Sequence, residues 1–480
     1  QEELFDQPKD LSDYILNIEK EMRNLGRRII EETLEEMNST IKDSNKRKQH
    51  WLIEKYSEKE LITSLGAIHF KKTLFTSKDS IDENGKPEMC YLLDKALGLT
   101  PNQRYTDDAV GKIYEEAVKT SYRRGGEAVS LEDSVSKEAV KDLLHKTHFP
   151  KYENPNEKKK VEYLYIDADE DHYSLQFKDK KGDLEKSGNG RKNNGAINKL
   201  IYVYEGIEEE SPSRNRLVGT HYFCRGTDQD NKELWKEVYE YIEDNYDTEY
   251  LKKIYLNADG GSWIKEGINI FNGVNFVLDE FHLNEQLGRI TRPLKDSQWD
   301  AIQELRKIIS HNRKAEFEGL IGQILEYARD EKETKRIITA SEYIQNNWVA
   351  ARRRLMRCEN IIGSSTEGHV YHVLSSRMST DPLGWSRRGA SQMARLREYY
   401  KNGGDMLELA RYQKKVLKQA AGAEMLENEA GEMLIEKAHQ RTRTQKEYGK
   451  YSECYSSKVP TYLKKAMSPN SDPYYIRIWF

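Results

Sequence analysis

A chain of 480 residues, 33% charged and 37% hydrophobic, is long enough for two to four domains that each bury a core. No apolar run approaches the roughly 18–20 residues of a membrane-spanning helix, and no signal peptide is visible, so we expect no membrane partner. The four cysteines (Cys90, Cys224, Cys358 and Cys454) are scattered without a CxxC pair. This argues against a zinc ribbon or a disulfide framework and favours a reducing compartment.

Charge is unevenly distributed along the sequence. The net charge of −4 does not by itself indicate nucleic-acid binding, yet residues 345–401 hold ten Lys or Arg against four Asp or Glu. A local excess of six positive charges can bind a phosphate backbone even in an acidic protein. The ordinary alternative for such a run is a solvated helix face.

The N-terminal region, residues 1–60, predicts one long helix over 10–42. Asp10 or Ser12 can cap this helix. Apolar side chains then recur at alternating steps of four and three: Leu11, Ile15, Ile18, Met22, Leu25 and Ile29. This is heptad spacing, and it fits either a dimer seam or a helix that packs on its own domain.

Residues 61–150 predict a small β-hairpin followed by a helix-turn-helix-like DNA-binding region. The hairpin is expected from strand-like runs at 65–75 and 89–93. Three short helices fit residues 106–119, 121–129 and 136–146. Arg123 and Arg124 precede the last helix, where a DNA contact is expected, although three-helix units are common without any DNA role.

A polar, proline-containing stretch at 150–160 marks a domain boundary, and the block after it is rich in strands. In its first run, residues 161–178, Asp167 and Asp169 share one face of a strand while apolar side chains share the other. Carboxylates that close together repel each other. They persist where a cation neutralises them or where the strand end is solvated.

Two later apolar runs also end in an acid. Strands are expected at 196–204 and 217–224, and a helix at 231–245. Asp259 then follows the apolar run 254–256, and Asp279 follows the run 274–278. Neighbouring strands of this kind present their acids at one edge of a sheet, where open α/β sheets place their sites. A single acid there usually marks only a solvated strand end.

Residues 284–357 show wholly helical spacing, so an all-α segment interrupts the α/β block. In the following segment, 358–405, Ser364 or Ser365 can cap a helix that carries Glu367 in its first turn. Taken alone, Glu367 is best explained as a helix-capping acid. Residues 406–480 predict a polar, helical tail.

The tract at 361–397, IIGSSTEGHVYHVLSSRMSTDPLGWSRRGASQMARLR, resembles the C-terminal signature of Mutator-like DDE transposases from bacterial insertion sequences. The signature consists of a Gly-Ser, a nearby Glu-Gly, a basic helix and a Trp-Ser-Arg-Arg-Gly-Ala run. The first acidic strand and the DEFH run from Asp279 to His282 also match that superfamily. The layout is most similar to the ISLre-type transposases over about residues 10–410.

This resemblance implies an RNase H-like catalytic core, an α/β fold with a mixed five-stranded sheet. The core would comprise residues 161–283 and 358–405, and the all-helical insertion 284–357 would interrupt it. The resemblance also implies that the mostly helical N-terminal region and its hairpin bind DNA, and that the tail 406–480 is helical.

The resemblance implies a DDE triad of Asp169, Asp259 and Glu367 that holds two Mg²⁺ or Mn²⁺ ions, with Asp167 as a rival for the first position. Two such ions stabilise the attacking and leaving oxygens of an in-line phosphodiester displacement. Asp279 and His282 would be accessory, although an ordinary strand-end histidine explains His282 equally well.

Arginine pairs with phosphate in a fork, so the arginines near these acids are expected to hold the DNA backbone. The candidates are Arg123, Arg124, Arg352, Arg353, Arg354, Arg377, Arg387, Arg388, Arg395 and Arg397. The implied partners are double-stranded DNA, at the transposon ends and at the target, and a second copy of the chain. The implied location is the bacterial cytoplasm, near the nucleoid.

The implied function is that of an insertion-sequence transposase, which binds terminal inverted repeats and performs metal-dependent phosphodiester hydrolysis and strand transfer. Two alternatives stay open. One is a transposase-derived DNA-binding protein without cleavage activity, and the other is an RNase H-fold nuclease that acts on another nucleic acid.

Overall fold

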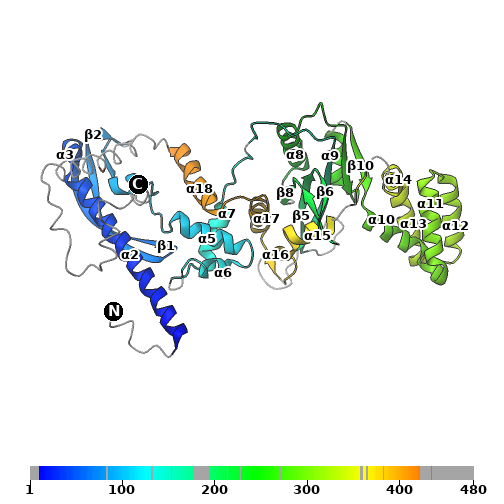
Figure 1. Cartoon of the computed structure of the whole chain (residues 1–480), viewed down its shortest axis with the longest axis horizontal. Helices are drawn as coiled ribbons and strands as arrows, with labels where there is room; N and C mark the ends of the chain where they lie inside the picture. The colour runs from blue at the N-terminus through cyan, green and yellow to red at the C-terminus, as the bar shows by residue number, and fades with distance from the viewer. Residues whose placement is uncertain are drawn as a thin grey trace. The chain divides into compact units, whose positions relative to one another are not determined.

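The computed structural model divides the chain into two compact units, Gln1–Thr106 with Leu417–Phe480, and Asp107–Val416 (Figure 1). The residues it describes are 10–82, 85–130, 133–152, 154–177, 194–212, 214–226, 229–270, 273–356, 360–363, 366–381, 383–421 and 434. Within these ranges, no helix has the length and apolar character needed to cross a membrane.

The first unit packs a long helix on a three-stranded antiparallel sheet. Its elements are α2 (Leu11–Asp43), α3 (Asn45–His50), β1 (Trp51–Thr63), β2 (Gly66–Ile81), β3 (Pro87–Cys90) and α4 (Leu92–Ala96), and the strand order is β1-β2-β3. Asp10 caps α2 by accepting a hydrogen bond from the Asp13 amide at 3.0 Å. Leu34 and Ile41 of α2 lie in one core with Phe70 and Phe75 of β2.

Strand β1 was not apparent from the sequence. Most of its side chains are exposed, including Leu52, Ile53 and Tyr56, so burial does not impose a clean alternation of apolar and polar residues. The predicted hairpin corresponds to β2 and β3, and β1 extends it to a third strand.

The second unit begins with the three predicted short helices, α5 (Asp107–Ala117), α6 (Tyr122–Glu127) and α7 (Lys137–Lys146). Ser121 caps α6 by accepting a hydrogen bond from the Arg124 amide, and Ser136 caps α7 in the same way from Ala139. Gly126 lets α6 approach the chain before α7, because a Cβ there would lie 1.9 Å from the Val135 carbonyl oxygen.

A mixed sheet follows. Its strands are β4 (Tyr163–Leu175), β5 (Gly195–Tyr204), β8 (His221–Gly226), β9 (Lys253–Ala258), β10 (Val274–Leu278) and the short β11 (Gly384–Trp385). The order is β10-β9-β4-β5-β8, with β11 beside β4; β4, β9 and β10 are parallel, and β5 and β8 continue antiparallel. The predicted mixed sheet of five main strands is therefore present.

The single strand predicted at 217–224 forms parts of two separate strands in the structure. A separate hairpin of β6 (Gly206–Ser211) and β7 (Arg214–Val218) precedes β8. The break falls at Gly219, which has a φ of +62°, a left-handed conformation that glycine adopts without strain.

Helices cover the sheet on the face opposite Asp167. Leu164, Ile166 and Ala168 of β4 pack against α8 (Asn231–Asn245) and α9 (Ser262–Ile270), through Trp235 and Ile264 among others. Because strand side chains alternate, Asp167 and Asp169 project from the other face, as predicted.

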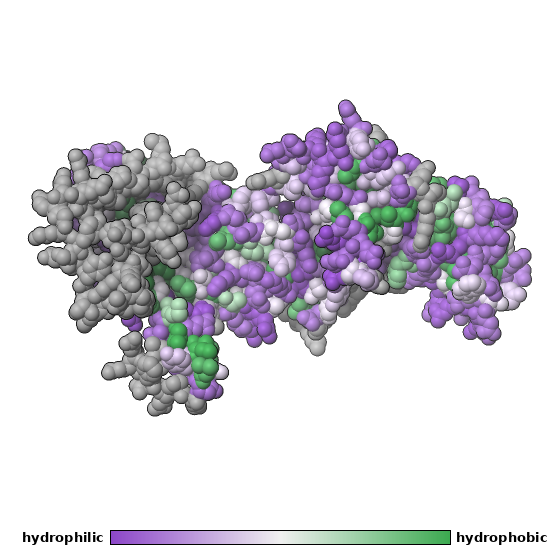
Figure 2. Space-filling model, viewed as in Figure 1, coloured by the Kyte–Doolittle hydropathy of each residue, from purple (hydrophilic) through white to green (hydrophobic). Residues whose placement is uncertain are grey.

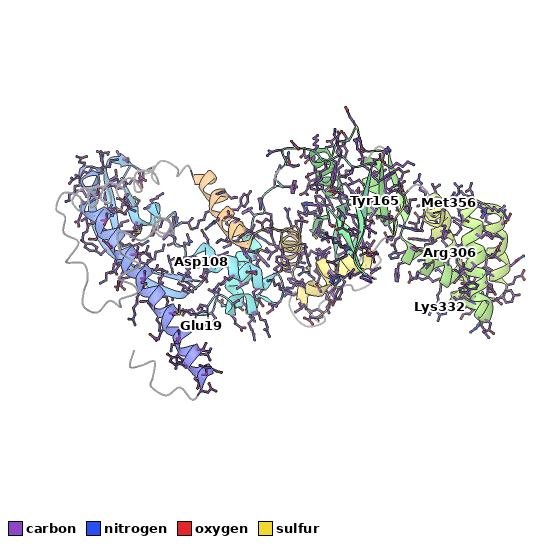
Figure 3. All side chains as sticks on the ribbon, viewed as in Figure 1. Glu19, Asp108, Tyr165, Arg306, Lys332 and Met356 are labelled. Carbon is purple, nitrogen blue, oxygen red and sulfur yellow. The ribbon has the colours of Figure 1, made fainter. Side chains whose placement is uncertain are left out.

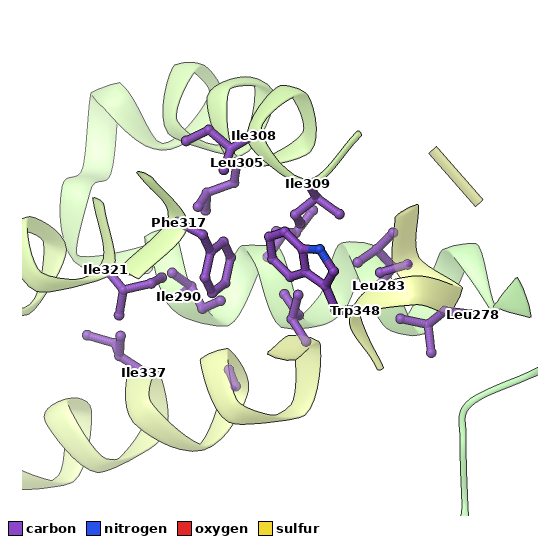
Figure 4. Close-up of a cluster of buried hydrophobic side chains, with 14 of the residues drawn as sticks. Leu278, Leu283, Ile290, Leu305, Ile308, Ile309, Phe317, Ile321, Ile337 and Trp348 are labelled. Atoms are coloured by element: carbon purple, nitrogen blue, oxygen red, sulfur yellow. The ribbon is translucent and has the colours of Figure 1, made fainter. Parts of the chain in front are cut away.

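The predicted all-helical segment forms a bundle with its own core (Figure 4). It consists of α10 (Glu280–Thr291), the 3₁₀ helix η1 (Arg292–Ser297), α11 (Gln298–Ser310), α12 (Lys314–Leu325), α13 (Glu331–Asn346) and α14 (Trp348–Met356). The chain then returns to the sheet through α15 (Thr366–Val370), η2 (Tyr371–Ser375), α16 (Ser376–Met378) and α17 (Arg387–Lys401), and α18 (Met406–Ala421) follows.

Candidate catalytic site

Three acids stand side by side at one edge of the sheet, hereafter the acid edge. Ala168 of β4 is in register with Ala258 of β9, and Ala258 is in register with Leu278 of β10. The next residue along each parallel strand is Asp169, Asp259 or Asp279. Since neighbouring strands lie roughly 4.8 Å apart, the register alone brings the three carboxylates together.

Asp259 is held by the turn that follows β9. Gly260 has a φ of +82°, and the Gly261 amide donates a hydrogen bond to Asp259 Oδ1 at 2.8 Å. The Tyr343 hydroxyl of α13 donates to the Asp259 carbonyl oxygen. The helical segment therefore contacts the acid edge directly.

Asp279 is the N-cap of α10 and fixes the position of His282. Its Oδ2 accepts hydrogen bonds from the His282 amide and from His282 Nδ1, both at 3.1 Å. The Asp279 hydrogen bond raises the pKa of His282 to about 9, with further contributions from the charges of Asp259 and Asp169, although burial opposes the shift. The predicted DxxH pair is thus a capping interaction at the acid edge.

Glu367 approaches the acid edge from α15. The Asp169 carboxyl has a pKa raised to about 7, first because it is largely buried and then because Glu367 and Asp259 bring like charges close to it. The Glu170 amide and His282 oppose this rise. Asp259 and Glu367, which follow Asp169 by 90 and 198 positions in the sequence, thus both lie close enough to act on it electrostatically. The serines expected to cap the Glu367 helix lie outside the described residues.

Asp167, the rival for the first acid, is fully buried and surrounded by protein donors. It accepts hydrogen bonds from Tyr202 Oη at 2.8 Å, Tyr204 Oη at 3.1 Å, Asn257 Nδ2 at 2.6 Å and Thr366 Oγ1 at 3.2 Å. Burial raises its pKa while these donors lower it. The Thr366 contact places the first turn of α15, and so Glu367, over β4.

Arg354 of α14 extends this network and was not recognised from the sequence as part of it. Its guanidinium donates to Asn257 Oδ1 at 2.6 Å, to the Leu278 carbonyl at 2.9 Å and to the Ile362 carbonyl at 2.8 Å. It is 1% exposed. Arg354 thus ties the helical segment, two strands of the acid edge and the approach to α15 together.

The donor set of the acid edge suits hard divalent cations, which prefer carboxylate oxygens. The like charges that crowd Asp169 are the environment that a bound cation relieves. As the side chains are placed, however, no three His, Cys, Asp or Glu residues among the described positions lie close enough to hold one metal ion. The site fits the chemistry of Mg²⁺ or Mn²⁺ without forming a closed set of ligands.

The ten arginines proposed from the sequence to bind DNA fall into two groups. Those on the surface are Arg123 and Arg124 of α6 and Arg387 and Arg388 of α17. Arg388 also donates to the His145 carbonyl of α7 at 2.7 Å, so α17 is joined to the three-helix region.

The remaining arginines are engaged within the protein. Arg377 and Arg397, each 5% exposed, donate to the carbonyls of Ala117 and Val118 respectively. Three further arginines are half-buried. Arg352 donates a hydrogen bond to the Ser310 carbonyl, and Arg353 donates one to the Phe276 carbonyl. The guanidinium of Arg395 lies over the Phe149 ring. These contacts stabilise the fold, as does Trp385, whose Nε1 donates to the Met378 carbonyl.

Comparison with known proteins places the chain among relatives along most of its length. The uncharacterised protein family UPF0236 matches residues 7–415. A UPF0236 protein of Caldanaerobacter subterraneus subsp. tengcongensis, whose name carries eleven locus designations, is 34% identical over 412 residues, 85% of this chain and 81% of that protein. A UPF0236 protein in the vanSb 3′ region of Streptococcus gallolyticus is 22% identical over 417 residues, 82% of this chain and 84% of that protein.

Among solved structures, the chain aligns with the Drosophila P element transposase strand transfer complex. The alignment has 10% identity and a TM-score of 0.22, and it covers 72% of this chain and 88% of that chain. A TM-score this low carries no argument about fold or function.

Proposed function

Since the chain belongs to the UPF0236 family, whose members match it along most of its length, we propose that it is a DNA transposase of an insertion sequence. It binds terminal inverted repeats and performs metal-dependent phosphodiester hydrolysis and strand transfer. The observation that carries this proposal is the approach of Asp169, Asp259 and Glu367 to one another from two strand ends and one helix.

The family relationship supports a mobile element. One relative carries eleven locus designations within one strain, and another carries four, which is the distribution expected of a gene that copies itself within a genome. We assign the chain to the Mutator-like DDE group, of the ISLre type with an RNase H-like core. The tract around Glu367 and the central position of the strand that carries Asp169 support this assignment.

In the proposed mechanism, Asp169, Asp259 and Glu367 would hold two Mg²⁺ or Mn²⁺ ions. Such ions would supply Lewis-acid activation of the attacking water or 3′-hydroxyl and charge stabilisation at the leaving oxygen. Asp279 holds His282 by its Nδ1, so that Nε2 is the ring nitrogen that can face a DNA phosphate. Asp167 positions the helix that carries Glu367 through Thr366.

The partners in this proposal are DNA and a second copy of the chain. The exposed arginines of α6 and α17, which lie in one unit with the acid edge, supply phosphate contacts. Joining two transposon ends requires two active sites, so the active complex contains at least two copies.

The test uses purified protein, Mg²⁺ and labelled DNA that carries the ends of the element. Asp259→Asn and Glu367→Gln keep the shape of each side chain and remove its charge. We expect each to reduce cleavage by at least about 10²-fold, since metal-ion catalysis supplies several kcal/mol. Asp381→Asn, an exposed acid on the loop before β11, is the matched control. Cleavage by either triad variant at the rate of this control would refute the assignment.

A DNA-binding protein without cleavage activity is the second candidate. The absence of a three-ligand cluster among the described side chains favours it. This second candidate predicts that the Asp259→Asn and Glu367→Gln variants bind the element ends as tightly as the unsubstituted chain. It also predicts that the unsubstituted chain does not nick these ends in the presence of Mg²⁺ or Mn²⁺. A nuclease that acts on another nucleic acid would instead cut RNA under the same conditions.

A further inference from the structure

A groove runs between α10 and α13, and its lining is basic. The cavity, of about 380 Å³, is lined by Gln286, Arg289, Lys332, Lys335, Arg336, Thr339 and Ala340. We call it the basic groove. Nothing in the sequence pattern singled out these residues, because α13 also carries acids and its net charge is unremarkable.

One wall of the basic groove leads to the acid edge. Lys332, Arg336, Thr339 and Tyr343 recur at steps of four, three and four, so they line up along one face of α13. At the end of this line, the Tyr343 hydroxyl donates to the carbonyl oxygen of Asp259. At 1.5 Å of rise per residue, Arg336 lies about 10 Å and Lys332 about 16 Å along the helix from Tyr343, the residue that contacts Asp259. Figure 3 shows Lys332 on the helical segment.

The other wall belongs to α10, whose N-cap is Asp279. Arg289 lies ten residues further along and pairs with Glu285 at 2.8 Å, so its charge is already compensated. Lys332, Lys335 and Arg336 have no acidic partner within ion-pair distance among the described residues. Four cations line the groove, and among the described residues Arg289 is the one of them that forms an ion pair.

The helix dipole explains little of this arrangement. Only Lys332 lies in the first turn of α13, where the macrodipole disfavours cations, and Asp330, Glu331 and Glu333 already place acids there. The groove and its cations, on a helix face that leads to Asp259, fit a polyanionic ligand.

We propose that the basic groove binds the phosphodiester backbone of the DNA strand on one side of the scissile phosphate. At about 3.4 Å of rise per nucleotide, 10 to 16 Å places its contacts about three to five nucleotides from the cut. This inference rests on the proposed function for the identity of the cut, but the binding of a phosphate backbone does not depend on cleavage.

The test measures DNA affinity against salt with the full chain, in EDTA, using a short fluorescein-labelled duplex. The triple variant Lys332→Gln, Lys335→Gln, Arg336→Gln should reduce the magnitude of the slope of log affinity against log salt concentration by about 2.7. Each phosphate contact contributes about 0.9 to this slope. The control is Lys232→Gln, Lys236→Gln, Lys265→Gln, three exposed cations on α8 and α9, which cover the opposite face of the sheet.

A slope for the groove variant that equals that of the control would overturn the inference. Folding is checked by the thermal midpoint, which should stay or rise slightly in the groove variant because one cation, Lys332, leaves the first turn of α13. The two proposals fail separately. If the chain never cuts DNA but the groove variant reduces the slope, the groove proposal stands and the transposase proposal fails. If the chain cuts DNA and the groove variant leaves the slope unchanged, the transposase proposal stands and the groove proposal fails.

Discussion

Two aspartates separated by one residue on β4 have acquired different environments. Asp167 is enclosed by four donors, whereas Asp169 faces the like charges of Glu367 and Asp259. Their shared face was predictable from strand alternation, but the choice between them was not. It depends on Tyr202, Tyr204 and Asn257, which reach Asp167 from other strands.

Arg354 shows that the burial of a charged side chain cannot always be recognised from the sequence. In the run Arg352 to Arg354, three identical residues predict three equivalent DNA contacts, yet Arg354 alone is fully buried with three acceptors. The sequence carries no signal for this difference, because all three lie in the same basic stretch.

Replacing Arg354 should therefore destabilise the second unit strongly. Arg354→Met leaves the Leu278 and Ile362 carbonyls and Asn257 without their donor, and we expect a loss of about 3–5 kcal/mol in the free energy of unfolding. Arg353→Met, next to it, removes one contact to Phe276 and should cost about 1 kcal/mol. Urea unfolding of both variants measures the difference, and equal losses would contradict the buried network.

His221 should make stability depend on pH. Burial among Tyr152, Tyr241 and Phe223 lowers its pKa to about 4, from 6.5 in the unfolded chain. The unfolded chain therefore binds the proton first, so stability is complete above pH 6.5 and falls as the pH drops towards 4. Between pH 7 and pH 5, we expect a loss of about 2 kcal/mol from this group.

The variant His221→Phe keeps the aromatic packing and removes the titration. Measured by urea unfolding at both pH values, it should lose about 2 kcal/mol less than the unsubstituted chain. His369, whose pKa burial also lowers to about 4, stays in both proteins and cancels in the comparison. An identical pH dependence in the two proteins would show that His221 is solvated.

At the scale of elements, α2 carries two apolar stripes with different partners. Ile30, Leu34, Met37 and Ile41 face the sheet of the first unit. The predicted heptad positions lie on the N-terminal half, where Leu11, Ile15, Met22 and Leu25 are 55–72% exposed. Packing on its own domain is thus seen for the C-terminal half of the helix, and the dimer seam stays a prediction for the N-terminal half. Figure 2 shows hydrophobic surface on this N-terminal half.

We expect the exposed stripe to bind the same stripe of a second copy. Ile15, Met22 and Ile29 at heptad position a, with leucine at two d positions, suit a two-stranded coiled coil. Met22→Glu places like charges in that seam and should weaken self-association by at least about tenfold in sedimentation, since a buried unpaired charge costs several kcal/mol. Leu16→Glu, at an equally exposed apolar position off the stripe, is the control. A chain that stays monomeric without substitution would rule the seam out.

At the scale of the molecule, the parts that could be predicted are those with strong local periodicity. The helical segment between β10 and α15, the neighbouring strands β4, β9 and β10 and the acids at their ends were evident because buried faces repeat at fixed spacing. Glu367 was indicated as a site residue only by resemblance, since its helix has five residues and Glu367 itself is exposed. The basic groove was hidden because its walls come from helices more than forty residues apart.

The two units hold separate cores, and this should divide their unfolding. The first core includes Phe75 of β2, fully buried among Ile41, Trp51 and Phe70, whereas the second includes Ile201 of β5 beside Leu256 and Trp235. Chains with independent cores depart from two-state unfolding. Phe75→Ala should therefore reduce the free energy of unfolding of the first unit by about 3–5 kcal/mol and lower the midpoint of one calorimetric transition. Ile201→Ala should reduce that of the second unit by about 2–5 kcal/mol and lower the midpoint of the other transition. One transition that both substitutions lower alike would mean that the units unfold as a single cooperative body, and the α2 and acid-edge variants would then have to be interpreted together.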